Sequence, residues 1–343
     1  MLKTAIVILN WNGKKFLERF LPSVISNSNG NGFAVYIADN GSTDESLPWL
    51  EENYPLVRLI RLDKNYGYAQ GYSLALQQIE AEYFVLLNSD VEVTPHWVSP
   101  IIELMDNDKS IAACMPKIKS FQNNELFEYA GAAGGFIDRY GYPFCRGRIL
   151  NVIEKDQGQY NDITEIFWAS GACMFLRASL YFEAGGLDAG FFAHMEEIDL
   201  CWRMKRLGYK VMYSPEVTVY HVGGGTLPNN TPHKIYLNYR NNLYLLYKNL
   251  ASEKLFTTLF MRMILDGISS CLYIMQGKFS FFWSVLRAHA AFYLSIRELC
   301  KKRKIFNKNE KIRNPSGIFR KSILYRFFIK NERYFHQFES KDL

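Results

Sequence analysis

Four short polar clusters in the first half of the chain carry side chains that could bind a cation or a polar ligand. Each cluster directly follows an apolar run, and together they occupy residues 10–13, 39–44, 63–67 and 88–90. Their carboxylate and amide oxygens are the ligands that hard divalent cations prefer. One such cluster alone could be a turn or a helix cap, which is the commoner role of Asn, Asp, Ser and Gly. Four clusters at matching positions favour one shared site.

A fifth group of reactive side chains lies further along the chain, where Glu196, Glu197 and Asp199 crowd the start of a predicted helix over residues 196–207. A carboxylate held near an attacking hydroxyl can act as a general base. Acids are also favoured at helix N-termini by the helix dipole, and Asp199 is placed to pair with Arg203 four residues later. The sequence leaves both interpretations open, although ion pairing explains Asp199 better than it explains Glu197.

His221 ends a predicted strand over residues 217–221 and is a candidate metal ligand. Imidazole is a ligand that manganese accepts beside oxygen donors. A lone histidine is more often a structural hydrogen-bonding group. Both interpretations stay open on the residue alone.

The elements that must position these residues alternate between strands and helices. Apolar, β-branched runs predict strands over residues 4–9, 33–38, 56–62 and 83–87. Helical patterns separate the runs over residues 14–26, 45–51 and 68–79. Such alternation predicts an α/β fold with a mixed, mostly parallel sheet covered on both faces. Ligands bind beyond the carboxyl ends of such strands, where the four polar clusters would meet.

The second half is predicted to contain further strands over residues 166–177, 211–214 and 217–221 and a Gly-rich turn over 183–190. The loop at residues 223–232 interrupts the pattern with glycines and prolines, and the sequence beyond it looks helical and aromatic. We therefore expect a catalytic domain over residues 1–230 and a helical module over residues 231–343.

Composition and charge narrow the class of protein. Hydrophobic residues make up 48% of the 343 residues, which excludes global disorder. The six cysteines form no CxxC pair, so a structural zinc site and a disulfide scaffold are not expected. The apolar run after Met1 is too short for a signal peptide, and a reducing cytosol fits best.

The basic character of the chain belongs to its C-terminal tail. Residues 301–343 contain thirteen Lys or Arg and four Asp or Glu, a net charge of +9, whereas the whole chain carries +6. This tail could contact anionic lipid or be a solvated helical cap, and we expect no nucleic-acid partner. The longest apolar stretch, residues 255–275, contains Arg262 and Asp266, which could pair at i,i+4. We interpret it as a buried or interfacial amphipathic helix and not as a membrane span.

The motifs taken in order resemble the family 2 glycosyltransferases, and more narrowly the rhamnosyltransferase-like branch that builds bacterial surface polysaccharides. The resemblance rests on DNGSTD, NYGYAQGY, LLNSDVEV, SGACMF and MEEIDLCWR, followed by the strand that ends at His221, and it covers about residues 1–245. It implies a GT-A fold, a UDP- or dTDP-linked sugar donor, a divalent metal cofactor (Mn or Mg), and inversion at the anomeric carbon.

The resemblance also implies roles for single residues. The metal ligands would be Asp90 and His221. The residues that would bind the nucleotide sugar are Asn10, Asp39, Ser42, Asn65, Gly67, Asn88, Ser89 and Asp90. The catalytic group would be Glu197 as the base, with Glu196 and Asp199 beside it. The acceptor side would contain Trp168 and Gly171, although Trp168 could equally be an ordinary core residue.

Two positions depart from the family pattern. Asn88 replaces the first acid of an Asp-x-Asp metal motif, and Glu197 replaces the second acid of a Glu-Asp pair. A catalytically inactive nucleotide-sugar-binding or scaffold protein of the same fold is therefore the alternative. A nicotinamide dehydrogenase is disfavoured, because the turn at residues 10–15 reads NWNGKK and not GxGxxG.

The predicted function is transfer of a single sugar to an acceptor hydroxyl. No Gln-x-x-Arg-Trp signature of the processive sugar polymerases is present. The acceptor would be lipid-linked or an oligosaccharide. The C-terminal module would hold the protein peripherally at the inner, cytoplasmic face of the cell membrane.

Overall fold

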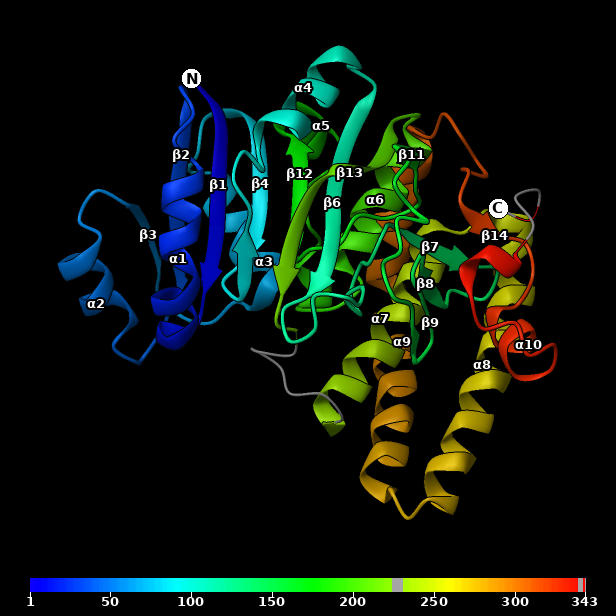
Figure 1. The fold of residues 1–343 in the computed structure, drawn as a ribbon. Helices are drawn as coiled ribbons and strands as arrows, with labels where there is room; N and C mark the ends of the chain where they lie inside the picture. Colours follow the sequence, from blue (N-terminus) through cyan, green and yellow to red (C-terminus); the bar gives the residue numbers. More distant parts are fainter. Residues whose placement is uncertain (224–230, 339–341, 343) are drawn as a thin grey trace.

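The computed structural model describes residues 1–223, 231–338 and 342. Within them the chain folds around a central mixed sheet with strand order β11-β13-β6-β12-β4-β1-β2-β3, and β5 pairs with β13 (Figure 1). The strands are β1 (Leu2–Asn10), β2 (Phe33–Asn40), β3 (Arg58–Leu62), β4 (Ala81–Asn88), β5 (Val91–Val93), β6 (Ile111–Ser120), β11 (Thr164–Glu165), β12 (Cys173–Arg177) and β13 (Lys210–His221).

The half of the sheet predicted from the sequence is parallel. β1 pairs in parallel with both β2 and β4, and β2 pairs in parallel with β3. β12 runs antiparallel between β4 and β6, while β13 is parallel to β6. The strands β1 and β4 are buried along most of their length, as continuous apolar runs require in a sheet covered on both faces. The predicted α/β class with a mixed, mostly parallel sheet is confirmed.

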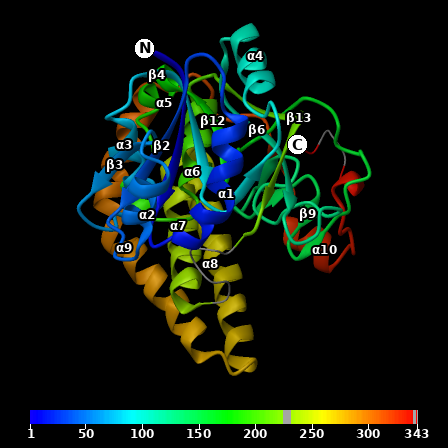
Figure 2. The same cartoon turned by 60° about the vertical axis from the view of Figure 1, so that its left-hand side comes forward.

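Helices connect and cover these strands, with α1 and α3 on opposite faces (Figures 1 and 2). They are α1 (Lys14–Asn27), α2 (Ser46–Asn53), α3 (Gly67–Leu76), α4 (Ser99–Asn107), α5 (Ala178–Glu183) and α6 (Glu196–Arg206). Gly208 follows α6 with φ +91°, the left-handed conformation that ends many helices.

The predicted strands of the second half needed correction. Only Cys173–Arg177 of the predicted strand 166–177 forms a strand, because Trp168 instead bridges to Gly135 of a second sheet. The two predicted strands over 211–214 and 217–221 are one strand, β13, whose register shifts between Ser214 and Thr218. Pro215 lies in this shift and has no backbone N–H to donate to a ladder.

A second, small sheet has the order β10-β9-β8-β7-β14 and lies beside the central one (Figure 1). Its strands are β7 (Gly135–Asp138), β8 (Pro143–Cys145), β9 (Arg148–Ile149), β10 (Val152–Ile153) and β14 (Ile318–Phe319). The chain beyond residue 230 is therefore not wholly helical as predicted, since β14 pairs with β7. Phe319 and Phe327 of the C-terminal tail are buried with the main hydrophobic core.

Three long helices complete the fold: α7 (Pro232–Asn249), α8 (Ser252–Met275) and α9 (Phe279–Lys308). A short helix, α10 (Ile323–Phe328), follows β14. The predicted ion pair on α8 is confirmed, with Arg262 Nε 2.7 Å from Asp266 Oδ1. The predicted glycine- and proline-rich loop falls largely on residues 224–230, which lie outside the described residues.

Candidate active site

A cavity of about 620 Å³ opens at the carboxyl ends of the strands. The ends of β4 and β13 contribute Asn88 and His221, and the loop after β4 contributes Ser89 and Asp90. Residues of the segment before α6 form another wall. Of the predicted site residues, those that line it are Asn65, Gly67, Asn88, Ser89, Asp90, Gly171, Glu196, Glu197 and His221. The clustering expected from the strand topology is therefore present in the structure.

A hydrogen-bonded cluster of three predicted nucleotide-binding residues lies at the ends of β1 and β2, beside the cavity and outside the set of residues that line it. Asn10 Nδ2 donates to Asp39 Oδ1 at 3.0 Å and to Ser42 Oγ at 3.1 Å. The backbone N–H of Ser42 donates to Asp39 Oδ2 at 3.0 Å, so this cluster also forms a turn of the kind that polar clusters commonly make. The cluster holds this turn next to Asn12, whose side chain lines the cavity and accepts from the backbone N–H of Thr43 at 2.7 Å.

Asn65 and Gly67 shape the neighbouring wall. Asn65 Oδ1 accepts hydrogen bonds from Asn40 Nδ2 at 3.1 Å and from the backbone N–H of Gly67 at 2.8 Å. Gly67 has φ +73°, and a Cβ there would lie 2.7 Å from the carbonyl oxygen of Phe192. Only glycine fits this turn without displacing the Phe192 segment.

The candidate metal ligands Asp90 and His221 face each other. His221 Nε2 lies 3.1 Å from Asp90 Oδ1 and 3.4 Å from Asn88 Nδ2. On the other side of the ring, Nδ1 lies 3.4 Å from Glu128 Oε1. Burial opposes a charge on His221, but the carboxylates of Glu128 and Asp90 raise the pKa of its imidazole to about 10.

This donor set fits a divalent cation. In many metal sites a carboxylate contacts one ring nitrogen of a histidine, orients the ring and leaves the other nitrogen for the metal. Glu128 is placed to do this at Nδ1 of His221, which leaves Nε2 for the cation. The strongly raised pKa of His221 indicates a place where the surrounding carboxylates already favour positive charge. Among the described residues, no group of three or more His, Cys, Asp or Glu stands out as a complete cation site. A cation at Asp90 and His221 would therefore need ligands from the substrate or from water.

Glu196 and Glu197 line the same cavity from the start of α6. In each, the Oε2 atom is buried and has no hydrogen-bond partner among the described residues. Burial raises the pKa of Glu197 to about 7, although backbone hydrogen bonds lower it in part. Burial and then the charge of Glu197 hold the pKa of Glu196 well above its usual range. Carboxyl groups in a cavity whose pKa values are raised by burial are typical of acid–base chemistry.

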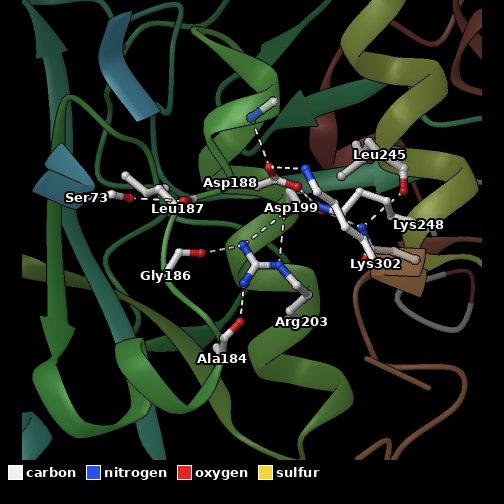
Figure 3. A network of polar contacts seen from close by, with 12 residues as sticks. Ser73, Ala184, Gly186, Leu187, Asp188, Asp199, Arg203, Leu245, Lys248 and Lys302 are labelled. Carbon is white, nitrogen blue, oxygen red and sulfur yellow. Dashed lines mark hydrogen bonds and ion pairs between the residues drawn. The ribbon is translucent and has the colours of Figure 1, made fainter. Parts of the chain in front are cut away.

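Asp199, also predicted in the catalytic group, does not line the cavity. It is fully buried in a polar network between α6, α7 and α9 (Figure 3). Asp199 Oδ2 lies 2.9 Å from both Arg203 and Lys248, and Oδ1 accepts from Asn249 Nδ2 at 2.8 Å. Because every oxygen is engaged by a neighbouring side chain, the structure gives Asp199 a structural position and not the catalytic one predicted.

The same network joins the helices through Lys248, which is fully buried and also pairs with Asp188 at 2.5 Å. Lys302 of α9 pairs with Asp188 at 2.8 Å (Figure 3). Breaking a buried pair by removing one partner costs about 3–5 kcal/mol, because the other charge stays buried. We expect Lys248→Met to lower the free energy of unfolding by about this amount. Urea denaturation would measure it, with the exposed Lys304→Met as the matched control; equal stability of both variants would contradict the role of the network.

Of the two predicted acceptor-side residues, Gly171 lines the cavity and Trp168 does not. Trp168 is buried outside the cavity lining, and its Nε1 donates to the carbonyl of Phe136 at 2.8 Å, so it is a core residue. Gly171 lines the cavity, and its carbonyl accepts from Tyr68 Oη at 2.7 Å. A Cβ on Gly171 would lie 2.6 Å from the hydroxyl oxygen of Tyr68. Tyr68 is thus held against the cavity wall by a close backbone contact.

Several cavity residues were missed by the sequence analysis. His194, which lines the wall before α6, has a buried Nε2 with no partner among the described residues. Burial and the nearby Lys234 and His233 lower its pKa to about 4, so it is neutral at physiological pH. Tyr68 lies within the NYGYAQGY motif, and an aromatic hydroxyl in that motif could have indicated a residue that contacts the substrate. Glu128 contacts His221 from outside the cavity lining, and it was missed because its stretch of sequence has no periodic pattern.

Comparison with known proteins identifies the family. The sequence model of glycosyl transferase family 2 matches residues 5–182, about half of the chain. The N-acetylglucosaminyl-diphospho-decaprenol L-rhamnosyltransferase of Mycobacterium tuberculosis is 25% identical over 232 residues, which cover 63% of this chain and 75% of that protein. The low-salt glycan biosynthesis hexosyltransferase Agl10 of Haloferax volcanii is 20% identical over 259 residues, covering 74% of this chain and 76% of that protein.

Solved structures agree in fold. GalNAc-T7, crystallised with UDP, GalNAc and Mn²⁺, matches 97% of this chain and 57% of its own, with a TM-score of 0.60 at 17% identity. The mannosyltransferase PcManGT of Pyrobaculum calidifontis, in complex with GDP-Man and Mn²⁺, matches 90% of this chain and 85% of its own, with a TM-score of 0.51 at 12% identity. The predicted GT-A fold is confirmed. This chain therefore belongs to glycosyl transferase family 2, within its rhamnosyltransferase-like branch, and is a glycosyltransferase.

Proposed function

We propose that the protein is an inverting glycosyltransferase that moves one hexosyl or deoxyhexosyl unit from a UDP- or dTDP-linked donor to an acceptor hydroxyl, in the synthesis of a cell-surface polysaccharide. The observation that supports this best is that one cavity is lined by both sets of residues. Asp90 and His221 lie 3.1 Å apart in it, and Glu197 carries a buried carboxylate oxygen with no partner among the described residues. Different side chains would therefore serve leaving-group stabilisation and proton removal.

Asp90 and His221 would hold a divalent metal, Mn or Mg. When bound, such a cation would neutralise the negative charge that develops on the departing diphosphate. Glu128 would keep the imidazole of His221 oriented from its other nitrogen. Asn88 and Ser89 lie at the same edge of the cavity, where they would contact the donor.

The transfer itself forms one bond and breaks one. The acceptor oxygen attacks the anomeric carbon from the side opposite the diphosphate, and the bond between that carbon and the diphosphate oxygen breaks. Glu197 accepts the proton of the acceptor hydroxyl, which requires its carboxylate form. With its pKa raised to about 7, Glu197 is poised to take up a proton near neutral pH. Burial and the charge of Glu197 raise the pKa of Glu196, and its protonated form could donate a hydrogen bond to a substrate oxygen.

We also propose a lipid-linked acceptor and peripheral attachment to the inner face of the cell membrane, with residues 1–230 as the catalytic domain and 231–343 as the membrane-associating helical module. The relative from Mycobacterium tuberculosis, whose name specifies a diphospho-decaprenol substrate, supports such an acceptor. One helix of the described chain, Ser252–Met275, is long and apolar enough to cross a membrane by length and composition alone, which is weak evidence.

A thermal-shift screen of nucleotide sugars, each with and without Mn²⁺, tests the donor proposal. A true donor present at about 100 times its dissociation constant stabilises the folded state by about 2.7 kcal/mol. We expect the largest shift with one UDP- or dTDP-linked sugar, and only when the metal is present. Metal-dependent hydrolysis of the same donor should accompany it. A metal-dependent shift without any turnover would instead favour a catalytically inactive binding protein.

A further inference from the structure

The helices α8 and α9 form an antiparallel hairpin whose connecting end projects away from the rest of the molecule (Figures 1 and 2). The hairpin end, defined here as residues 267–286, comprises the last turns of α8, the connection and the first turns of α9. Both views show the rest of the fold lying to one side of it. Few parts of the protein can therefore cover its side chains.

The hairpin is unusually apolar on its outside. Met275 is 81% exposed, and Phe279 and Trp283 are each 61% exposed. Phe260, Ile268 and Leu272 add to the same exposed apolar surface. Monomeric soluble proteins rarely expose so many large apolar side chains together, and such patches mark contacts with a protein or a membrane.

The charged groups in the middle of α8 are turned inward. Arg262 and Asp266 are both buried and pair at 2.7 Å, and His289 of α9 lies 3.1 Å from the other oxygen of Asp266. Arg262 also lies over the ring of Tyr142, 4.2 Å from its centroid, and so fixes the middle of α8 to the small sheet. This attachment argues against α8 alone crossing a bilayer. It leaves the hairpin end free to contact a surface.

The charges that remain on the outside have one sign. From Lys254 to Arg297 the only acidic residue is Asp266, which is buried, whereas Lys278 and Arg287 are exposed. Two copies of this surface placed face to face would bring cations together without a carboxylate to pair them, which disfavours a homodimer. An anionic lipid surface complements both the positive charge and the apolar side chains.

The hairpin end also lies on the functional side of the central sheet. The arrowheads of β1 and β4, whose ends contribute Leu9 and Asn88 to the cavity, point toward the side from which the hairpin projects (Figure 1). We propose that residues 267–286 insert into the surface of an anionic bilayer and hold this edge of the sheet toward the lipid. The purpose of this contact, access to a lipid-linked acceptor, rests on the proposed function. The lipid contact itself does not depend on catalysis.

This inference assigns attachment to the hairpin and not to the basic tail. The tail returns to the small sheet, where Phe319 is fully buried and β14 pairs with β7. Truncation of the tail would therefore disturb the fold and test nothing about lipid. Point substitutions on the hairpin end are the sharper experiment.

The full-length protein would be sedimented with phosphatidylcholine vesicles that contain graded amounts of phosphatidylglycerol. We expect binding that rises with anionic lipid. The partition coefficient should be at least about tenfold lower for Met275→Glu and for Phe279→Glu, since each loses an apolar side chain that the lipid would bury. Leu56→Glu, which changes a 96% exposed leucine outside the hairpin, is the matched control and should bind like the parent. Brominated lipid should quench part of the tryptophan fluorescence, and Trp283→Phe should abolish the quenching.

The outcomes separate this inference from the proposed function. If the hairpin variants bind vesicles as well as Leu56→Glu does, or if they only change a dimer into a monomer, the hairpin proposal is overturned. The donor-induced thermal shift should be the same in all these variants, which also shows that they are folded. Vesicle binding that depends on Met275 and Phe279 without any donor response would leave the lipid contact standing and contradict the glycosyl-transfer proposal.

Discussion

Glu197→Gln should lower kcat by about 10²–10⁴-fold while leaving donor affinity nearly unchanged. The substitution keeps the shape of the side chain at the start of α6 but removes its ability to accept a proton. Donor affinity should be preserved, because the proposed metal ligands Asp90 and His221 are unchanged and belong to other elements than α6. Steady-state kinetics at saturating donor, together with a direct donor-binding titration, would measure the two effects separately.

The parent enzyme should show a matching pH dependence. The base must be ionised to act, and burial raises the pKa of Glu197 to about 7. The rate should therefore fall as the pH drops below about 7 and level off above it, and Glu197→Gln should lose this dependence.

Two variants serve as controls for this assignment. Glu197→Asp retains a carboxylate and should retain measurable activity, which a purely structural role of the side chain would not require. Glu196→Gln should be affected less, because a protonated Glu196 and a glutamine can both donate a hydrogen bond. If Glu196→Gln were crippled while Glu197→Gln stayed active, the two roles would have to be exchanged.

Asp90→Ala should abolish transfer and remove the metal dependence of donor binding. The variant takes away the carboxylate that lies 3.1 Å from His221 Nε2, so the cation would lose a charged protein ligand. Because Lewis-acid stabilisation of the leaving group contributes several kcal/mol, we expect turnover to fall by at least about 10³-fold.

The metal assignment can be checked without turnover. Titration of Mn²⁺ in the presence of nucleoside diphosphate, followed by electron paramagnetic resonance, should show weaker binding in Asp90→Ala and His221→Ala. Glu92→Gln is a suitable control, since it changes an acid two residues away that is not among the cavity residues. Undiminished turnover of Asp90→Ala would end the metal assignment.

The sequence determined the parts of this site that depend on local pattern and topology. Continuous apolar runs with intervening helices predicted the parallel half of the sheet, and the carboxyl ends of parallel strands necessarily lie at one edge. That rule predicted that Asn65, Asn88 and Asp90 share one site, and the family resemblance added His221; all four line the cavity. The Arg262–Asp266 pair was predictable for a similar reason, since residues four apart on a helix are neighbours.

The tertiary structure alone decided the roles that depend on partners distant in sequence. Asp199 and Glu197 are two residues apart on α6, yet Lys248 and Asn249 of α7 engage the first and leave the second facing the cavity. Trp168 is a core residue, and its indole N–H donates a hydrogen bond to the carbonyl of Phe136, which is distant in the sequence. No periodicity along the chain carries this information, because such contacts arise only when elements from different regions pack together. The exposed apolar face of the α8–α9 hairpin was likewise decided by tertiary structure. Composition predicted an apolar helix, but only the packing of the other elements determined which of its sides stays exposed.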